Sequence, residues 1–163
     1  MTGPVIVAAP LAGTVVGLEA VPDVVFAGGM VGPGAAIEPY ADSVEVVAPV
    51  AGTVVKVHPH AFVLATGEGL GVLVHLGIDT VGLRGEGFEV LRAEGDVVAC
   101  GDPMVRWSPA DVRARGLSAV CPVVVLDVDA ARVSVPATGA VRPGDALLEY
   151  AAGADPSRRH PAR

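Results

Sequence analysis

Apolar residues occur along this chain in short, valine-rich runs, and glycine or proline separates one run from the next every several residues. The sequence contains 21 glycines and 14 prolines. Short apolar runs bounded by turn residues are typical of strands joined by tight turns. The pattern therefore predicts an all-β fold, either a sandwich or a barrel.

The strand pattern also repeats within the chain. APLAGTVVG at Ala9–Gly17 returns as APVAGTVVK at Ala48–Lys56, and more faintly as VPATGAV at Val135–Val141. VVACGDPMV at Val97–Val105 is similar to AVRPGDALL at Ala140–Leu148. Repeated strand–turn–strand units predict a core built from two related halves.

One short helix and a tail interrupt the strand pattern. Ser108 as N-cap, Pro109 at the first helical position and Gly116 at the end predict a short surface helix. From residue 151 onward the strand pattern is lost. We therefore expect one domain at residues 1–150 and a flexible C-terminal tail at residues 151–163.

Three of the four histidines lie in one nearly uncharged stretch, residues 58–80. Within it, two apolar runs flank Gly67-Glu68-Gly69, which predicts a β-hairpin. A two-residue type II′ turn would place His60 directly opposite His75, with Cβ atoms roughly 4.5–5.5 Å apart. A three-residue loop would shift the register and lose this pairing.

The two-residue turn also assigns the side chains of the hairpin to two faces, because side chains alternate along a strand. The predicted core face carries Ala61, Val63, Ala65, Leu70, Val72 and Val74. The opposite face carries the histidine pair together with Phe62, Leu64, Gly71 and Leu73. Histidines among exposed apolar residues indicate a docking surface for another protein.

Length and charge limit the possible functions. A chain of 163 residues can build one full hydrophobic core. No apolar run approaches the roughly 18–20 residues that span a bilayer, and the N-terminus lacks the basic region of a secretory signal, so we expect a cytoplasmic protein. The net charge of −7 argues against nucleic-acid binding and is compatible with a basic protein partner.

The two cysteines, Cys100 and Cys121, form no C-x-x-C motif. In a cytoplasmic protein such residues are usually small buried hydrophobes, and we expect neither a disulfide nor a metal pair. Cys121 lies in a valine-rich run and is expected in the core, which argues against a phosphocysteine site there.

The segment GLGVLVHLGIDTV at Gly69–Val81 resembles the active-site signature of the glucose-type enzyme IIA of the bacterial phosphoenolpyruvate-dependent sugar phosphotransferase system. The resemblance covers roughly residues 5 to 150. Further segments fall in the same order as in this family: Val21–Pro39, Ala48–Val57, Leu83–Asp102 and Cys121–Val125.

This resemblance implies an antiparallel β-sandwich that uses no cofactor. It further implies a phosphoryl relay, in which the phosphocarrier HPr donates and a cysteine of the IIB domain of a sugar permease accepts. The protein would then approach the membrane only indirectly, through the permease. His75 would be the phosphorylated residue and His60 its partner, while Asp23 and Asp79 would flank the site and meet arginines of the partners. An apolar docking surface would include Phe26, Val57, Phe62 and Leu73.

The residue types suit this chemistry. A neutral imidazole nitrogen is a competent nucleophile towards a phosphoryl group. A second imidazole can donate a hydrogen bond to a phosphoryl oxygen if its other nitrogen is held in the right tautomer, for which Thr66 or another hydroxyl is a candidate. His58 stands where the family typically has threonine. It is either solvent-exposed without contacts or a third imidazole that completes a zinc site with His60 and His75, with Asp79 or water as fourth ligand.

Two other classes of protein fit parts of the pattern. A zinc-dependent hydrolase could use His58, His60, His75 and Asp79, although lysostaphin-like peptidases have these motifs in the reverse order along the chain. A carrier domain for biotin or lipoate needs a lysine at a hairpin tip. The only lysine, Lys56, lies inside a predicted strand.

Overall fold

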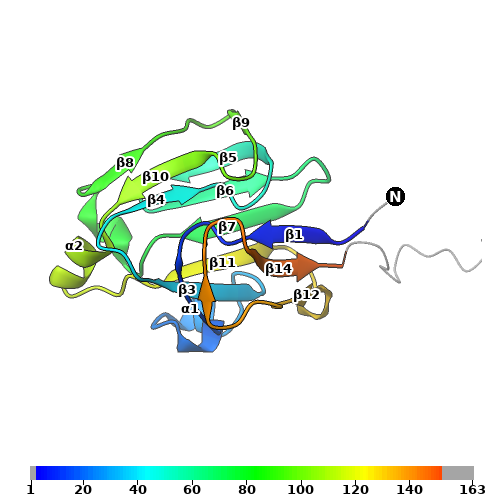
Figure 1. Cartoon of the computed structure of the whole chain (residues 1–163), viewed down its shortest axis with the longest axis horizontal. Coiled ribbons are helices and arrows are strands. Elements are labelled where there is room, and N and C mark those ends of the chain that lie inside the picture. The colour runs from blue at the N-terminus through cyan, green and yellow to red at the C-terminus, as the bar shows by residue number, and fades with distance from the viewer. Residues whose placement is uncertain (1–2, 152–163) are drawn as a thin grey trace, which may run out of the picture.

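The computed structural model describes residues 3–151, which form three antiparallel β-sheets (Figure 1). The large sheet has eight strands in the order β13-β2-β3-β11-β7-β6-β5-β9. Their bounds in that order are Ala140–Val141, Gly13–Val16, Gly34–Pro39, Cys121–Leu126, Gly71–His75, Ala61–Ala65, Gly52–His58 and Val97–Val98.

Two three-stranded sheets complete the sandwich. One has the order β1-β14-β12, with bounds Val5–Ala8, Ala146–Tyr150 and Val133–Ser134. The other has the order β4-β10-β8, with bounds Val44–Val47, Pro103–Trp107 and Phe88–Val90. The predicted antiparallel sandwich of short strands is confirmed.

The main hydrophobic core combines side chains from the large sheet and from both small sheets. Valine and leucine dominate it, including Val46, Leu64, Val72 and Leu148. Few aromatic residues take part, so β-branched side chains fill most of the interior, as suits a pleated surface.

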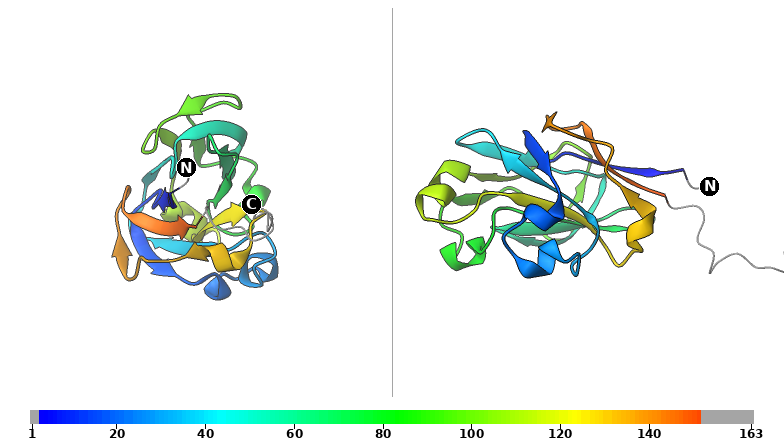
Figure 2. Two further views of the ribbon diagram at one scale, coloured as in Figure 1. Left: turned by 90° about the vertical axis from the view of Figure 1, so that its right-hand side faces the viewer. Right: turned by 90° about the horizontal axis from the view of Figure 1, so that it is seen from below.

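A second, smaller core lies on the opposite face of the large sheet. The 3₁₀ helix η1 (Leu18–Ala20) and helix α1 (Val24–Ala27) cover this face near β3 and β11, as the two views of Figure 2 show. Their buried side chains are Leu18 and Phe26, which pack with Ala36, Ile78, Val120 and Val124. The side chain of the last residue of β7 is on this covered face.

The sheet order is symmetric about the boundary between β11 and β7, as the sequence repeats predicted. The two A-P segments bond each other reciprocally: the Ala8 N–H donates to Pro49 O and the Val47 N–H donates to Pro10 O, each at 2.9 Å. One half of the molecule is residues 44–107, the continuous half. The other, the split half, consists of residues 5–39 and 121–150.

The two Gly-Asp turns occupy matching places in these halves. The Ala48 N–H donates to Asp102 O at 2.8 Å, and the Ala9 N–H donates to Asp145 O at 2.7 Å. The faint third echo at residues 135–141 is not a further copy of the A-P segment, because it contributes β13, which pairs with β2. The prediction of two related halves is therefore confirmed.

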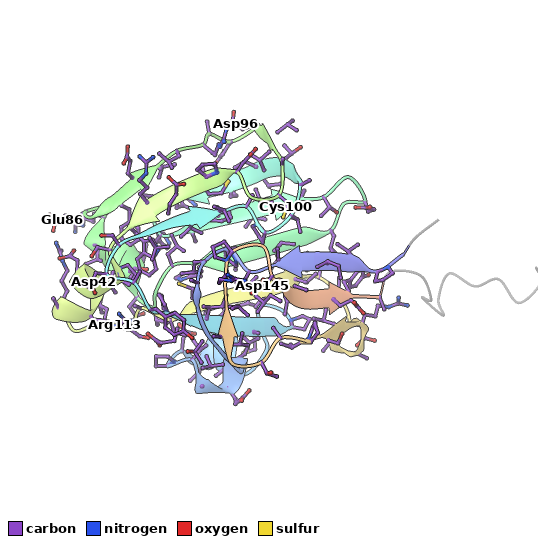
Figure 3. All side chains as sticks on the ribbon, viewed as in Figure 1. Asp42, Glu86, Asp96, Cys100, Arg113 and Asp145 are labelled. Atoms are coloured by element: carbon purple, nitrogen blue, oxygen red, sulfur yellow. The ribbon has the colours of Figure 1, made fainter. Side chains whose placement is uncertain are left out.

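The short helices lie at the connections between strands. In α2 (Pro109–Ala114) the Ser108 hydroxyl accepts a hydrogen bond from the Asp111 N–H at 3.0 Å, which confirms the predicted cap. Arg113 bonds Glu38 at 2.6 Å, and Arg115 pairs with Glu86, at the end of the molecule where Figure 3 labels Glu86 and Arg113. The remaining 3₁₀ helices are η2 (Thr80–Leu83) and η3 (Ala130–Arg132). The predicted tail lies, except for Ala151, outside the described residues.

The register predicted for the central hairpin is wrong by one residue. Ala61, not His60, lies opposite His75, because a three-residue loop connects β6 and β7. The Gly69 N–H donates to Thr66 O at 2.9 Å, and the Leu70 N–H donates to the Thr66 hydroxyl at 3.1 Å. Gly69 has φ +86°, the left-handed conformation that such a loop requires at its last position.

The shift of one residue exchanges the two faces of β6. Phe62, which was predicted on the docking face, is only 1% exposed and packs in the main core with Leu64. Val63 and Ala65 lie half-buried on the other face instead. The faces of β7 are as predicted, since Val72 and Val74 belong to the core.

Candidate active site

His75 is the last residue of β7, and its half-buried ring lies on the face covered by α1. Its Nδ1 is 2.6 Å from Gly77 O. A carbonyl oxygen can only accept, so Nδ1 carries the proton and donates it to this bond. The lone pair of Nε2 is consequently the one available for chemistry.

His60 reaches the same place from a turn rather than from a strand. β5 ends at His58, which pairs with Ala61, so Pro59 and His60 form the turn between β5 and β6. The His60 carbonyl accepts a hydrogen bond from the Leu76 N–H at 2.7 Å, which fixes this turn beside the end of β7. The centroids of the two imidazoles are 5.3 Å apart and their planes meet at 70°.

Two further rings extend this pair into a row. The rings of His58 and His60 are stacked, with centroids 5.7 Å apart and planes at 22°. The rings of Phe26 and His75 make a T-shaped contact, with centroids 5.3 Å apart and planes at 66°. His58 is thus exposed but not without contacts, and it orients the His60 ring by stacking. Thr66 does not hold the His60 tautomer, because its hydroxyl accepts from Leu70 at the far end of the hairpin.

The environment favours the neutral form of both central imidazoles. Burial lowers the pKa of His75, and the hydrogen bond to Gly77 and the charges of Asp23 and Asp79 oppose that shift. Burial also lowers the pKa of His60, and His75 and His58 lower it further. Two neutral imidazoles therefore face each other at neutral pH.

Asp23 caps the helix that brings Phe26 to the site. Its carboxylate accepts hydrogen bonds from the Val25 N–H at 2.9 Å and the Phe26 N–H at 3.3 Å. An N-cap carboxylate satisfies backbone donors that a helix start leaves free. One side chain thus orders α1 and places negative charge near His75.

Asp79 lies at the start of η2, and its charge also acts on His75. It is exposed, and its backbone has φ +63°, a left-handed conformation that aspartate tolerates better than most residues. The two aspartates predicted to flank the histidines are therefore both at the site.

The predicted docking residues divide into two groups. Phe26 is buried with its ring against His75, and Phe62 is in the main core, so the prediction of Phe62 as a surface residue is wrong. Val57 and Leu73 are half-buried against the main and the second core. The apolar side chains that are exposed beside the two aspartates are Val24 at 83%, Val25 at 43% and Val81 at 62%.

Comparison with known proteins decides among the classes considered. The profile of the family described as phosphoenolpyruvate-dependent sugar phosphotransferase system, EIIA 1, matches residues 5–131. The chain belongs to this enzyme IIA family. It is therefore a phosphoryl carrier component of a sugar phosphotransferase system.

Individual enzyme IIA relatives agree with the family match. The chain is 44% identical over 140 residues to a glucose-specific EIIA component of Staphylococcus aureus, which covers 84% of this chain and 83% of that protein. It is 36% identical over 148 residues to a glucoside-specific EIICBA component of Staphylococcus carnosus, of which it covers 21%. The structure matches glucose permease IIA from Mycoplasma capricolum with a TM-score of 0.82 and 32% identity, over 91% of this chain and 96% of that one.

The zinc interpretations find no support in this enzyme IIA. Among residues 3–151, no group of three or more histidine, cysteine, aspartate or glutamate side chains is arranged to hold a metal ion. The His58 and His60 rings are nearly parallel, so their in-plane lone pairs point along separate planes rather than at one ion. The described residues therefore give no support to a zinc site of His58, His60 and His75, or to the zinc hydrolase alternative.

Other features of the described part of the chain lie away from the histidines. A cavity of about 490 Å³ borders β4, β8 and β10 and is lined by Glu45, Phe88, Arg106 and Trp107 among others. Cys121 is buried in β11, as expected, and burial raises the pKa of its thiol to about 12, whereas Cys100 is exposed, contrary to expectation. No helix within residues 3–151 is long and apolar enough to cross a membrane.

Sequence reasoning missed the groups that hold the histidines in place. The Gly77 carbonyl fixes the His75 tautomer, and the only signal for it was a glycine two residues after the histidine. The exposed Val24 and Val25 could have been found, because they follow Asp23, which is a good N-cap residue at the start of a short helix.

Proposed function

We propose that Nε2 of His75 accepts a phosphoryl group from phospho-HPr and passes it to the cysteine of a IIB domain. The observation that carries this proposal is the hydrogen bond from His75 Nδ1 to Gly77 O, which leaves Nε2 with a free lone pair beside the His60 ring. Because this relay starts from phosphoenolpyruvate, a product of intracellular metabolism, we place it in the cytoplasm.

The transfer is balanced without a further reactant. The Nε2 lone pair attacks phosphorus, the new N–P bond forms, and the electron pair of the breaking bond returns to the donor nitrogen. In the second step the IIB thiolate attacks phosphorus and the electron pair returns to Nε2. The proton stays on Nδ1 throughout, hydrogen-bonded to the Gly77 carbonyl oxygen, so the protein contributes positioning and charge stabilisation.

His60 serves as the stabilising partner in this proposal. Its ring is close enough to His75 for a nitrogen to donate a hydrogen bond to a phosphoryl oxygen on Nε2. The stack on His58 holds that ring in place. An already oriented donor stabilises the transferred charge without reorganising during the reaction.

The surface around His75 is proposed as the docking site for both partners. Asp23 and Asp79 provide negative charge on two sides, and Val24, Val25 and Val81 provide exposed apolar contacts. The half-buried Val57 and Leu73 would form its base, together with the edge of Phe26. A partner with arginines around an apolar centre is complementary to this surface. The name of the glucoside-specific EIICBA relative, which combines C, B and A components, supports a IIB acceptor.

The test is phosphorylation of purified protein by phosphoenolpyruvate, enzyme I and HPr, with mass-spectrometric mapping of the phosphate. His75→Ala should abolish labelling, because the variant lacks the nitrogen that accepts the phosphoryl group. His60→Ala keeps the nucleophile and should slow transfer by about 10²–10³-fold, as expected for loss of one oriented donor.

The fourth histidine of the chain offers a matched control. His160→Ala should be labelled at the wild-type rate. Stoichiometric labelling of His75→Ala, or an unchanged rate in His60→Ala, would contradict the roles assigned to these residues.

A further inference from the structure

The turn that follows His75 contains a buried hydroxyl that the relay does not use directly. Thr80 is 1% exposed, and its hydroxyl donates a hydrogen bond to Leu76 O at 2.7 Å. A buried hydroxyl is costly unless it is bonded, so this bond fixes the orientation of the carbonyl that it reaches. That carbonyl belongs to the peptide group joining Leu76 to Gly77.

The next peptide group is fixed from the loop between α2 and β11. The Ile78 N–H donates to Ser118 O at 2.9 Å, and this N–H belongs to the same peptide group as the Gly77 carbonyl. The two peptide groups on either side of Gly77 are therefore each held by one hydrogen bond. Together these bonds determine the direction in which Gly77 O points.

Gly77 lies in a position where a side chain would not fit. Its φ is +79°, and a Cβ at this position would lie 2.7 Å from Cγ2 of Thr80 and 2.9 Å from Ser118 O. Thr80 thus contacts the turn through its methyl group as well as through its hydroxyl. Gly77 O, the atom oriented in this way, lies 2.6 Å from His75 Nδ1.

We infer that Thr80 is a positioning residue that selects which nitrogen of His75 reacts, by holding the Leu76–Gly77 peptide so that Gly77 O accepts a hydrogen bond from Nδ1–H. The inference rests on the proposed role of His75 and adds the group that sets its tautomer. Without the Thr80 hydroxyl, the turn loses one of its two restraints and Gly77 O no longer stays within hydrogen-bond distance of Nδ1. The His75 ring then exists as a mixture of the Nδ1–H and Nε2–H tautomers.

The experiment compares Thr80→Val, which is isosteric but lacks the hydroxyl, with Thr80→Ser, which keeps the hydroxyl and lacks the methyl group. The first readout is the ¹⁵N chemical shifts of the His75 ring in the unphosphorylated protein. Wild type and Thr80→Ser should show one tautomer with the proton on Nδ1, and Thr80→Val a mixture of both. The second readout is the position of the phosphate, which should be Nε2 alone in the first two proteins and both nitrogens in Thr80→Val.

The rate of transfer from phospho-HPr should fall about tenfold in Thr80→Val, the usual effect of losing one hydrogen bond. A single Nδ1–H tautomer in Thr80→Val would overturn the inference. So would a mixture in Thr80→Ser, because it would assign the effect to methyl packing. If Thr80→Val does not fold, Thr80→Ala replaces it in the same comparison. The tautomer readout needs no phosphorylation, so failure of wild-type labelling would count against the proposed function alone.

Discussion

At the scale of single residues, the reactivity of His75 depends on opposing effects on the pKa of its ring. Burial lowers its pKa below the ordinary 6.5, and the Gly77 hydrogen bond and two aspartates limit the shift without reversing it. The ring is therefore neutral at neutral pH and retains a nucleophilic lone pair. Protonation of Nε2 would remove that lone pair.

The pH dependence of the transfer follows from this direction. The rate at which His75 accepts the phosphoryl group should be constant above pH 6.5 and should fall as the pH drops through the lowered pKa. Quenched-flow experiments with phospho-HPr at a series of pH values measure this rate. A rate that already declines above pH 6.5 would contradict a lowered pKa.

The same shifts link pH to stability. His60 and His75 both have lowered pKa values, so below pH 6.5 the unfolded chain binds more protons than the folded one. The free energy of unfolding should therefore decrease as the pH falls through this window. The double variant His60→Asn, His75→Asn is the control, and its unfolding midpoint in urea should depend less on pH.

At the scale of secondary-structure elements, α1 has a structural and an electrostatic link to the site through Asp23. The carboxylate of Asp23 caps α1, and α1 carries the Phe26 ring that contacts His75. Asparagine is as good an N-cap as aspartate, whereas alanine is a poor one. Two substitutions at one position can therefore separate the two roles.

Asp23→Ala should lower the free energy of unfolding by about 1 kcal/mol, whereas Asp23→Asn should leave it nearly unchanged. Both should bind HPr more weakly, because both lose the negative charge. Urea unfolding and calorimetric titration measure the two effects. Equal destabilisation by both variants would show that capping is not what Asp23 contributes, and unchanged affinity of Asp23→Asn would remove its charge from the interface.

The central hairpin shows what could be predicted from the sequence and what could not. Its two strands were predictable, since the apolar runs and the turn residues are adjacent in the chain. The register was not, because Gly67-Glu68-Gly69 suits either a two-residue or a three-residue connection. Nearly every residue of both strands is apolar, so alternation could not decide which face of β6 is buried.

His60 and His75 are neighbours even in the observed register, for a geometric reason. His60 precedes Ala61, the true partner of His75, by one residue, and it lies in the turn beside the end of β7. The fold class was predictable from valine runs and turn residues over the whole chain. The roles of the Gly77 carbonyl and the Thr80 hydroxyl were not, because they depend on the three-dimensional course of the turn after His75, which Ser118 O of a distant segment helps to fix through the Ile78 N–H.

At the scale of the whole molecule, the net charge of −7 attracts a basic partner. Association with a basic partner is then faster at low salt, and local charges at the interface contribute most. Asp79 is the exposed acidic residue closest in sequence to His75.

Asp79→Arg should weaken binding to HPr and reduce its dependence on salt, because an attractive charge becomes a repulsive one. Asp79→Asn is the control, since asparagine also tolerates the left-handed backbone at this position. Its affinity for HPr should lie between those of wild type and Asp79→Arg. Titration at low and high salt measures both. Equal affinity of all three proteins at low salt would exclude Asp79 from the interface.

The division into a continuous and a split half also determines the order in which strands can pair while the chain is being synthesised. Every strand pairing inside the continuous half, from β4 to β10, is possible once Trp107 has left the ribosome. The split half must wait, since β3 pairs with β11 and Val5 of β1 pairs with Tyr150 of β14. Pairings between distant residues form late because closing a long loop costs more entropy. The strands β5, β6 and β7, which position His60 and His75, can therefore assemble first, and the two ends of the described chain close the sandwich last.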